Sequence, residues 1–247
     1  MTRFRFMNTE IDSLSMDEVI REIEKLVIEN RNVHIVTPNV DHIVRLENDK
    51  EFQNVYKNAE LILADGMPLM WISRIYKMPI KEKISGSDLF PLICKMASKK
   101  GYSMYFLGAG NGVAERAAIN LVNKYPGLQV VGTYSPPYDF ENNNVEINKI
   151  IEKVKKQKPH ILIVGLGTPK QEKFILKYKQ HMGVPISLGL GASLDFEAGN
   201  IKRAPKWMSD AGLEWFYRLS KEPKRMFKRY LIDDMKIIRL IWKYKQK

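Results

Sequence analysis

Cysteine is almost absent from this 247-residue chain, which contains a single residue of that type, Cys94. One thiol cannot form a disulfide within the chain, so the sequence is not a small disulfide-stapled scaffold and favours a reducing compartment. Long apolar runs are missing as well. No uncharged stretch approaches the ~18 residues of a membrane span, and residues 1–18 contain no signal-peptide core. The sequence therefore predicts a soluble or peripheral protein.

Motifs for nucleic acid and for dinucleotides are also missing. We find no recognition-helix, zinc or RNP-like pattern in the chain. The glycine-rich turn at 108–112 places its third glycine one residue early for a dinucleotide fingerprint. The strand expected at 129–134 lacks the acidic residue that would bind a ribose. NAD is therefore disfavoured, whereas a mononucleotide or nucleotide sugar remains compatible with a turn that brings backbone close to a ligand.

Acidic residues are scarce relative to basic ones, and the imbalance lies at one end. The formal charge is +12, and the tail, residues 202–247, holds fourteen Lys or Arg against five Asp or Glu, which leaves about +3 for the rest. Aromatic and aliphatic residues recur in the tail at helical spacing, among them Phe216, Phe227, Ile238 and Trp242, with basic residues between them. This pattern is typical of a helix in an anionic membrane interface, and it also fits an ordinary surface helix packed on the core.

The stretch from His160 to Glu172, HILIVGLGTPKQE, predicts a buried strand, a Gly-x-Gly turn and the start of a helix. Its continuous apolar run is that of a strand covered on both faces of a parallel sheet. Thr168 is expected to cap the helix, with Pro169 in its first position and Gln171 closing a capping box. The free N–H groups and positive dipole end at such a turn suit a diphosphate, although a plain strand-to-helix connection gives the same pattern.

Two earlier strands are followed by polar residues. Thr37 and Asn39 follow a strand expected at 33–36, and Asp65 follows one expected at 61–63. A carboxylate at a strand end is fixed by its backbone and partly desolvated by the facing crevice, which suits catalysis. Asp65 fits equally well as a cap of the helix that follows it.

Helical patterns separate these strands. Asp41 and His42 lie just inside the helix that follows Asn39 and are expected to face solvent or to pack locally. Gly86 is expected to turn a loop, with Ser87 or Asp88 capping the helix that follows.

Several strand–turn–helix units thus direct their turns to one edge of a sheet. This repetition predicts a Rossmann-like, doubly wound, mostly parallel α/β domain over residues 1–201, with a basic amphipathic helical appendage at 202–247. The candidate substrate-binding residues of the α/β domain lie at these turns or beside them. They are Ser85, Gly108, Ala109, Gly110, Tyr138, Gly165, Gly167, Thr168, Lys170, Gln171, Gly191 and Asp195.

A family resemblance is carried by the motifs TPNVDH, ADGMP, GSDL, GLGTPKQE, GLGASLDFEAG and KRAPKWMSDAGLEWFYRLSKEPKRMFKRYL. Over roughly residues 8–231 the chain resembles the WecG/TagA/CpsF glycosyltransferases. The resemblance implies an inverting enzyme without a metal or other cofactor, which moves N-acetylmannosamine from its UDP conjugate to the 4-hydroxyl of N-acetylglucosamine on undecaprenyl diphosphate, as in wall teichoic acid assembly. Two alternatives stay open: another donor, such as UDP-N-acetylmannosaminuronic acid or UDP-glucose, and a non-catalytic nucleotide- or nucleic-acid-binding module.

The same resemblance implies residue roles. Asp65 matches the family's base, which would take the proton of the acceptor hydroxyl as that hydroxyl attacks from the face opposite UDP. Thr37 and Asn39 would line the sugar pocket, and Gln171 would reach the donor in preference to closing a capping box. Lys83 stands where many relatives have Arg, which puts a bidentate phosphate contact there in doubt.

The departing UDP needs a positive partner, and the chain has no Asp-x-Asp motif to hold a divalent ion. Arginine is the expected substitute. By the resemblance, Arg218 and Arg225 of the tail fold over the site, and Lys228 or Arg229 adds a third charge. Each of these cations would alternatively meet only lipid phosphate or solvent.

One hypothesis joins these features: the tail is mobile in solution, and docking on an anionic membrane surface brings Arg218 and Arg225 to the diphosphate. The expected partners are a UDP-sugar, an undecaprenyl-diphosphate-linked acceptor and that membrane surface, with no nucleic acid. The expected location is cytoplasmic, peripheral on the inner face of the bacterial cell membrane. The resemblance also implies self-association into a homo-oligomer. Deleting the tail should abolish turnover and leave a folded body.

Overall fold

The computed structural model describes residues 2–78, 80–221 and 223–245, and it confirms the predicted α/β architecture. The described strands of the central sheet are all parallel and run in the order β4-β3-β8-β7-β5-β6. Parallel strands joined by helices bring every carboxyl end to the same edge of the sheet. The strands are β3 Val33–Val36, β4 Leu61–Ile62, β5 Ser103–Gly108, β6 Gln129–Tyr134, β7 Ile161–Gly165 and β8 Ile186–Gly189.

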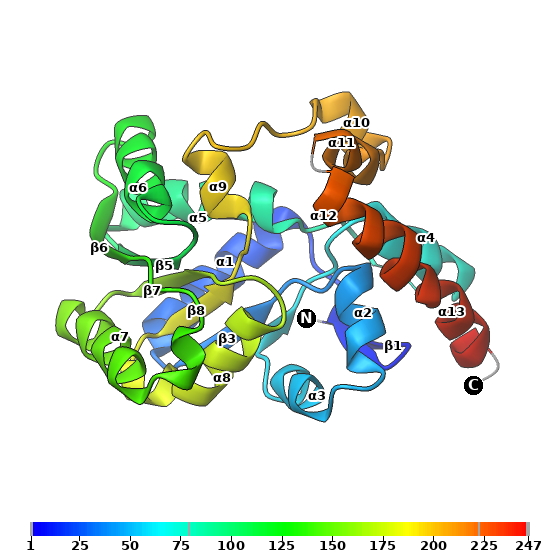
Figure 1. The fold of residues 1–247 in the computed structure, drawn as a ribbon, viewed down its shortest axis with the longest axis horizontal. Coiled ribbons are helices and arrows are strands. Elements are labelled where there is room, and N and C mark those ends of the chain that lie inside the picture. Colours follow the sequence, from blue (N-terminus) through cyan, green and yellow to red (C-terminus); the bar gives the residue numbers. More distant parts are fainter. Residues whose placement is uncertain (1, 79, 222, 246–247) are drawn as a thin grey trace.

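Helices cover both faces of this sheet (Figure 1). Alternate side chains of a strand point to opposite faces, so Met104 and Phe106 of β5 pack with one group of helices, and Tyr105 and Leu107 pack with the other. The first group is α1 Met16–Glu29, α5 Gly86–Lys100, α6 Val113–Lys124 and the short α9 Ser193–Glu197, and the second is α7 Asn144–Gln157 with α8 Lys170–Met182. A further cluster joins α2 Val40–Leu46, α3 Lys50–Lys57 and α4 Met67–Ile75.

An N-terminal hairpin, β1 Arg3–Phe6 and β2 Thr9–Asp12, fixes the strand that leads to Asp65. The buried carboxylate of Asp12 accepts a hydrogen bond from the backbone N–H of Ile62 at 2.9 Å. It also accepts two from the guanidinium of Arg3, at 2.8 and 2.9 Å. Charge-assisted, bidentate pairs of this kind are the strong ones, so the hairpin holds β4 in place.

Two of the expected helix starts differ in the structure. Ser85 caps α5 by accepting a hydrogen bond from the N–H of Asp88, and Gly86 is the first helical residue, so the expected loop turn at Gly86 and cap at Ser87 or Asp88 are wrong. The helix expected after Asn39 is two helices, because the side chain of Asp49 caps a second one by accepting from Phe52 N–H.

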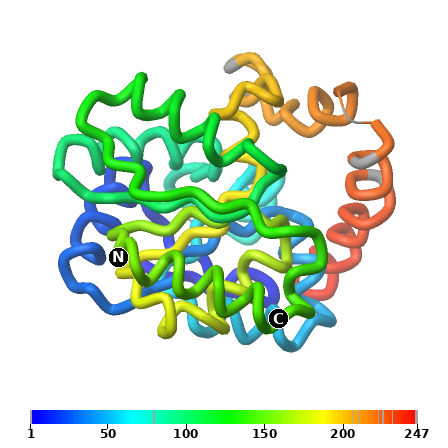
Figure 2. The backbone as a smooth tube through the Cα atoms, turned by 60° about the vertical axis from the view of Figure 1, so that its left-hand side comes forward, coloured from blue at the N-terminus to red at the C-terminus, as the bar shows by residue number. Residues whose placement is uncertain are grey.

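The tail runs along one side of the molecule, from orange to red in Figure 2. Its helices pack on the body: Leu240 is buried in the cluster that contains Ile43 and Leu46, and the hydroxyl of Tyr76 donates to the carbonyl of Ile241 at 2.9 Å. Among the described residues, no helix combines the length and apolarity needed to cross a membrane. The tail elements are α10 Lys206–Asp210, α11 Glu214–Lys221, α12 Pro223–Lys228, a π turn at Arg229–Asp233, a 3-10 turn at Asp234–Lys236 and α13 Ile237–Lys245.

We predict that Asp12→Ala lowers the free energy of unfolding by about 2–4 kcal/mol, because it leaves the Arg3 guanidinium and the Ile62 N–H without their shared acceptor. Glu10→Ala is the matched control, since Glu10 is exposed and lies 3.7 Å from the same guanidinium. It should cost less than about 0.5 kcal/mol. Urea unfolding measures both values, and equal losses in the two variants would contradict the anchoring role of Asp12.

Candidate active site

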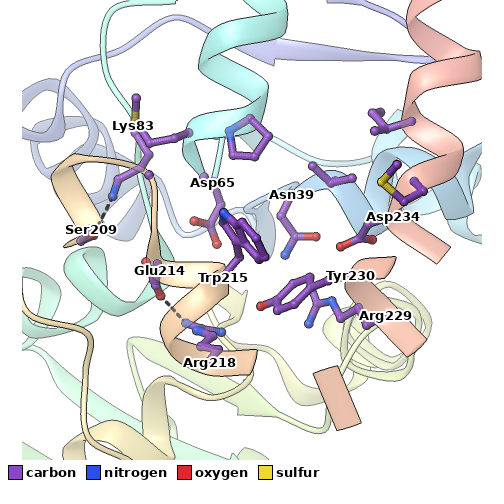
Figure 3. A pocket seen from close by; sticks show the side chains of 17 residues that line it. Asn39, Asp65, Lys83, Ser209, Glu214, Trp215, Arg218, Arg229, Tyr230 and Asp234 are labelled. Atoms are coloured by element: carbon purple, nitrogen blue, oxygen red, sulfur yellow. Dashed lines mark hydrogen bonds and ion pairs between the residues drawn. The ribbon is translucent and has the colours of Figure 1, made fainter. Parts of the chain in front are cut away.

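Two cavities lie at the carboxyl edge of the sheet and share a wall. The first, of about 300 Å³, has a mostly polar lining that includes Thr37, His42, Ser85, Ser87, Thr168 and Gln171; we call it the polar cavity. The second, of about 330 Å³, has an apolar lining that includes Met67, Pro68, Trp215, Tyr230, Met235 and Ile237; we call it the apolar cavity (Figure 3). The residues that line both are Asn39, Asp65, Glu214, Arg218 and Arg229.

Asp65 is placed by the end of β4. Its backbone N–H donates to the carbonyl of Pro38 at 2.8 Å, which ties the exits of β3 and β4 together. Gly66, at φ 99°, is the N-cap of α4 and allows the sharp turn from strand to helix. The alternative in which Asp65 caps that helix is therefore wrong. The Asp65 carboxylate makes no hydrogen bond or ion pair within the described part of the chain. It faces both cavities, where it is accessible to a ligand.

Burial and, after it, the neighbouring carboxylate of Glu214 raise the pKa of Asp65 to about 7. The cations Arg218 and Lys83 act in the opposite direction, but they do not offset the burial. A carboxylate with a pKa near neutrality is a much stronger base than an exposed one, while a useful fraction still lacks its proton at neutral pH. Asp65 is thus suited to accept a proton.

Two arginines of the tail, Arg218 and Arg229, line the shared wall together with Asp65 (Figure 3). Arg218 donates to Glu214 at 2.6 Å, and its guanidinium lies 5.2 Å from the ring centroid of Phe196. The buried Nε of Arg229 has no hydrogen-bond partner among the described residues. An unpaired guanidinium N–H beside a cavity suits an anionic ligand. Lys83, whose role the sequence left open, donates to Ser209 of the tail at 3.1 Å.

Thr168 does not cap α8. The N-cap is Pro169, without a side-chain hydrogen bond, and the Thr168 hydroxyl instead bonds His42 and Glu172. The predicted capping box is also wrong, because the side-chain oxygen of Gln171 accepts from the N–H groups of Gly167 and Gly191, each at 3.2 Å. Gln171 lines the polar cavity, and its contact with a donor stays a prediction.

Asp41 and His42 are both buried, so of the two expected environments local packing is right and exposure to solvent is wrong. His42 bonds the hydroxyl of Tyr56 at 2.6 Å and that of Thr168 at 2.8 Å. The sequence does not reveal the role of Tyr56, because its partner His42 lies on another helix. Thr168, the next member, lies 126 residues after His42.

Ten of the predicted site residues line the two cavities together. They are Thr37, Asn39, Asp65, Ser85, Gly167, Thr168, Gln171, Gly191, Arg218 and Arg229. Arg225 lies on α12, but its side chain is outside the part of the structure that is described.

The other predicted residues lie outside both linings. Gly108 and Ala109 pack against the next turn: the Ala109 N–H donates to the Gly165 carbonyl at 2.6 Å, and a Cβ on Gly108 would lie 2.5 Å from that oxygen. The glycine at 108 therefore permits close packing between the two turns. Lys170 pairs with Glu141 and lies over the exposed ring of Tyr138. The remaining members of this group are Gly110, Asp195 and Lys228.

Glu214, Trp215 and Tyr230 are lining residues that the sequence reasoning missed. Glu214 belongs neither to the basic residues of the tail nor to its apolar stripe. Its signal is the spacing to Arg218, since a carboxylate and an arginine four residues apart meet on a helix. Among the described residues, no group of three or more His, Cys, Asp or Glu side chains is placed to hold a metal ion.

The chain matches known proteins over nearly its whole length. The family model described as "Glycosyl transferase WecG/TagA/CpsF family" matches residues 4–247. The chain is 32% identical over 218 residues, 88% of this chain and 82% of the relative, to a Bacillus subtilis (strain 168) protein named N-acetylglucosaminyldiphosphoundecaprenol N-acetyl-beta-D-mannosaminyltransferase. A protein of the same name from Staphylococcus aureus (strain MW2) is 28% identical over 222 residues, 89% of this chain and 85% of that relative.

We predict that two substitutions in the tail shift the pKa of Asp65 in opposite directions. Glu214→Gln should lower it below about 7, because a like charge is removed, and Arg218→Ala should raise it, because a favourable cation is lost. Carboxyl-carbon NMR titration of Asp65 measures the shifts. Arg116→Ala is the control, since Arg116 bonds Asn200 away from the cavities and should leave the pKa unchanged. Shifts of the same sign, or none, would show that the tail does not face Asp65.

Proposed function

This chain belongs to the WecG/TagA/CpsF family of glycosyltransferases, and from that premise we propose that it transfers N-acetylmannosamine from UDP-N-acetylmannosamine to N-acetylglucosaminyl-diphospho-undecaprenol. The relatives' names supply the acceptor and the transferred sugar. The observation that carries the proposal for this chain is Asp65, an unpartnered carboxylate with a pKa of about 7 at the junction of two cavities.

The two cavities suit the two substrates by their polarity. The polar cavity has the hydroxyl, amide and backbone groups that a nucleotide sugar requires, and the glycine turns at Gly167 and Gly191 bring main chain to its wall. The apolar cavity, lined by Trp215 and Tyr230, suits the acceptor, whose sugar rings stack on aromatic faces and whose carrier is a lipid. Asp65 then lies where the two reacting groups meet.

The reaction is a single displacement. The acceptor 4-hydroxyl attacks the anomeric carbon from the face opposite UDP, so that the new C–O bond forms as the bond to the diphosphate oxygen breaks. Asp65 takes the hydroxyl proton, and UDP leaves with the bonding electron pair. Asn39, which shares the wall with Asp65, is placed to orient a sugar hydroxyl or amide.

Arg218 and Arg229 neutralise the charge that develops on the leaving diphosphate, since both line the shared wall. Metal independence is part of this proposal, and full turnover in the presence of EDTA is its test. Because the tail supplies both arginines, the site is complete only when the tail is docked.

The tail is also the proposed membrane contact. Many of its large apolar side chains are exposed, with Trp207 at 64%, Phe227 at 56% and Trp242 at 65%, and basic residues lie between them in the sequence. Exposed apolar groups among cations suit an anionic lipid interface. This surface would place the enzyme on the membrane face where UDP-sugars and the lipid acceptor meet. Because Leu240 belongs to a core cluster, removal of the whole tail would uncover core side chains, and point substitutions give the clearer test.

The donor is the least constrained part of the proposal. Asp41, Arg45 and Arg229 line the polar cavity, and such charges meet an extra carboxylate on the sugar favourably or unfavourably according to the pose. Turnover of UDP-N-acetylmannosamine, UDP-N-acetylmannosaminuronic acid and UDP-glucose on a short-chain acceptor distinguishes the donors. Binding of UDP without turnover of any of them would favour a nucleotide-binding module.

We predict that Asp65→Asn lowers kcat about 100- to 10,000-fold and leaves the Kd for UDP within about threefold, because the amide cannot accept the proton. In the unsubstituted enzyme, kcat/KM should rise with pH as Asp65 loses its proton, and level off above about pH 7. Asp195→Asn is the control, since that carboxylate accepts from Asn200 and lies outside both linings. Undiminished turnover by Asp65→Asn would rule out the proposed chemistry.

A second prediction concerns the membrane contact. Trp242→Glu should weaken cosedimentation with phosphatidylglycerol vesicles at least about tenfold, because a charge replaces an exposed aromatic ring in the interface. Turnover of a short-chain acceptor should stay within about twofold, since Trp242 lines neither cavity. Ile119→Glu on α6, where the isoleucine is 60% exposed, is the control and should bind like the unsubstituted protein. Equal binding by both variants would mean that α13 does not contact lipid.

A further inference from the structure

A buried chain of polar side chains runs from α3 to the turns of the polar cavity. The hydroxyl of Tyr56 lies 2.6 Å from Nδ1 of His42, and Nε2 of the same ring lies 2.8 Å from the hydroxyl of Thr168. That hydroxyl lies 3.2 Å from Oε1 of Glu172, which also accepts from the amide of Gln171 at 2.7 Å. Tyr56, His42, Glu172 and Gln171 are each at most 5% exposed.

The partners fix the direction of every bond in this chain. Oε1 of Glu172 accepts from Gln171 and from the Thr168 hydroxyl, so the Thr168 oxygen must itself accept from His42. His42 therefore carries its proton on Nε2, and its Nδ1 accepts from the Tyr56 hydroxyl. A neutral imidazole agrees with the burial that lowers the pKa of His42 to about 3.

The hydrogen bond from Gln171 to Glu172 sets the orientation of the Gln171 side-chain amide. Because the NH₂ group of Gln171 points to Glu172, its oxygen faces the other way and accepts from Gly167 N–H and Gly191 N–H. One oxygen thus joins the turn after β7 to the turn after β8, and both turns line the polar cavity. The amide packs close to β8 in the space that a side chain at Gly189 would take, since a Cβ there would lie 2.9 Å from its Cγ and Nε2.

We propose that Tyr56 and Glu172 are positioning residues for the nucleotide sugar: through His42, Thr168 and Gln171 they set the separation of the two glycine turns that hold it. Neither Tyr56 nor Glu172 lines the cavity, so each acts through its neighbours. The inference rests on the proposed function in one respect, since it takes the polar cavity to be the donor site.

Glu172 is the hub of this chain, and its protonation state follows from its surroundings. Its Oε2 is buried without a partner among the described residues, and no cation pairs with it there. The groups that face it are Gln171 and Thr168 at hydrogen-bond distance, neutral His42 at 3.9 Å, and the carboxylate of Asp41 further away. Burial raises the pKa of Glu172 to about 7. Oε1 can accept both bonds whether or not Oε2 carries a proton.

Tyr56→Phe is the sharpest test, because it removes one oxygen outside the cavity and keeps the ring packed on Phe52 and His42. The Kd for UDP, measured by calorimetry, and the KM for the donor should rise about three- to tenfold, whereas kcat and the KM for the acceptor should stay within about twofold. Tyr105→Phe is the matched control, since this buried tyrosine of β5 makes no hydrogen bond through its hydroxyl in the described part of the chain. A Kd for Tyr56→Phe within twofold of the unsubstituted protein would overturn the inference.

Variants at the hub separate positioning from packing. Glu172→Gln keeps an oxygen acceptor for Thr168 and Gln171 and should bind UDP within about threefold of the unsubstituted protein, whereas Glu172→Leu fills similar space without an acceptor and should lose tenfold or more. Equal losses in the two variants would contradict the role of the acceptor. The double variant of Tyr56→Phe with Thr168→Val should bind no worse than Thr168→Val alone, because the two groups act in one chain. Additive losses of UDP affinity in the double variant would contradict the action of Tyr56 and Thr168 in one chain.

Hydrogen exchange tests the hydrogen-bond network in the absence of any ligand. The amide protons of Gly167 and Gly191 should exchange faster in Glu172→Leu than in the unsubstituted protein, because both bond the oxygen that Glu172 orients. If exchange and UDP binding are both unchanged in the variants, the positioning role is wrong and the proposed function stands. If the unsubstituted protein does not bind UDP, the donor site is wrong, whatever the exchange rates are.

Discussion

The desolvation of Asp65 is the constraint on which the site depends. A pKa of about 7, where an exposed aspartate has 3.8, means that the ionised form is disfavoured by about 4 kcal/mol. This free-energy cost is larger than the stabilisation that a surface ion pair provides, so the rest of the fold has to hold the carboxylate in place. The backbone bond to Pro38 and the anchoring of β4 by Asp12 do this from the body. The tail then closes the site from the other side.

The tail supplies charges of both signs to this carboxylate. Its overall charge is strongly basic, yet the group that raises the pKa of Asp65 most after burial is the carboxylate of Glu214, and Arg218 on the same helix lowers it. One turn of helix thus sets the basicity of the base and holds a guanidinium beside it. In the proposed reaction the arginine is needed as UDP departs, so its pairing with Glu214 keeps it ordered until an anion arrives.

The sequence predicted the sheet and the position of Asp65 because both follow from local patterns: apolar runs of strand length, and polar residues directly after them. It did not predict the partners of Thr168. The threonine has the side chain of a helix cap, but the fold brings His42 to it from 126 residues away, and the stronger competing bonds take its hydroxyl. The turn at 108–112 also depends on a contact with a distant segment. Gly108 is required by the close approach of the Gly165 carbonyl, which no local pattern reveals.

The two cavities are lined by different parts of the chain, and this difference bears on how each proposed substrate binds. The polar cavity is framed largely by turns of the central sheet, cross-linked through Gln171, whereas the apolar cavity takes much of its lining from the tail, including Trp215 and Tyr230. In the proposed assignment, donor binding depends mainly on the turns of the sheet, with Arg218 and Arg229 added by the tail, and acceptor binding depends on the docked tail. The tail also carries the exposed apolar surface proposed to contact lipid, so the proposed acceptor site lies beside the proposed membrane contact. In the proposed reaction the docked tail, which brings Arg218 and Arg229 to the shared wall, would also shield the bound donor and limit loss of the activated sugar to water.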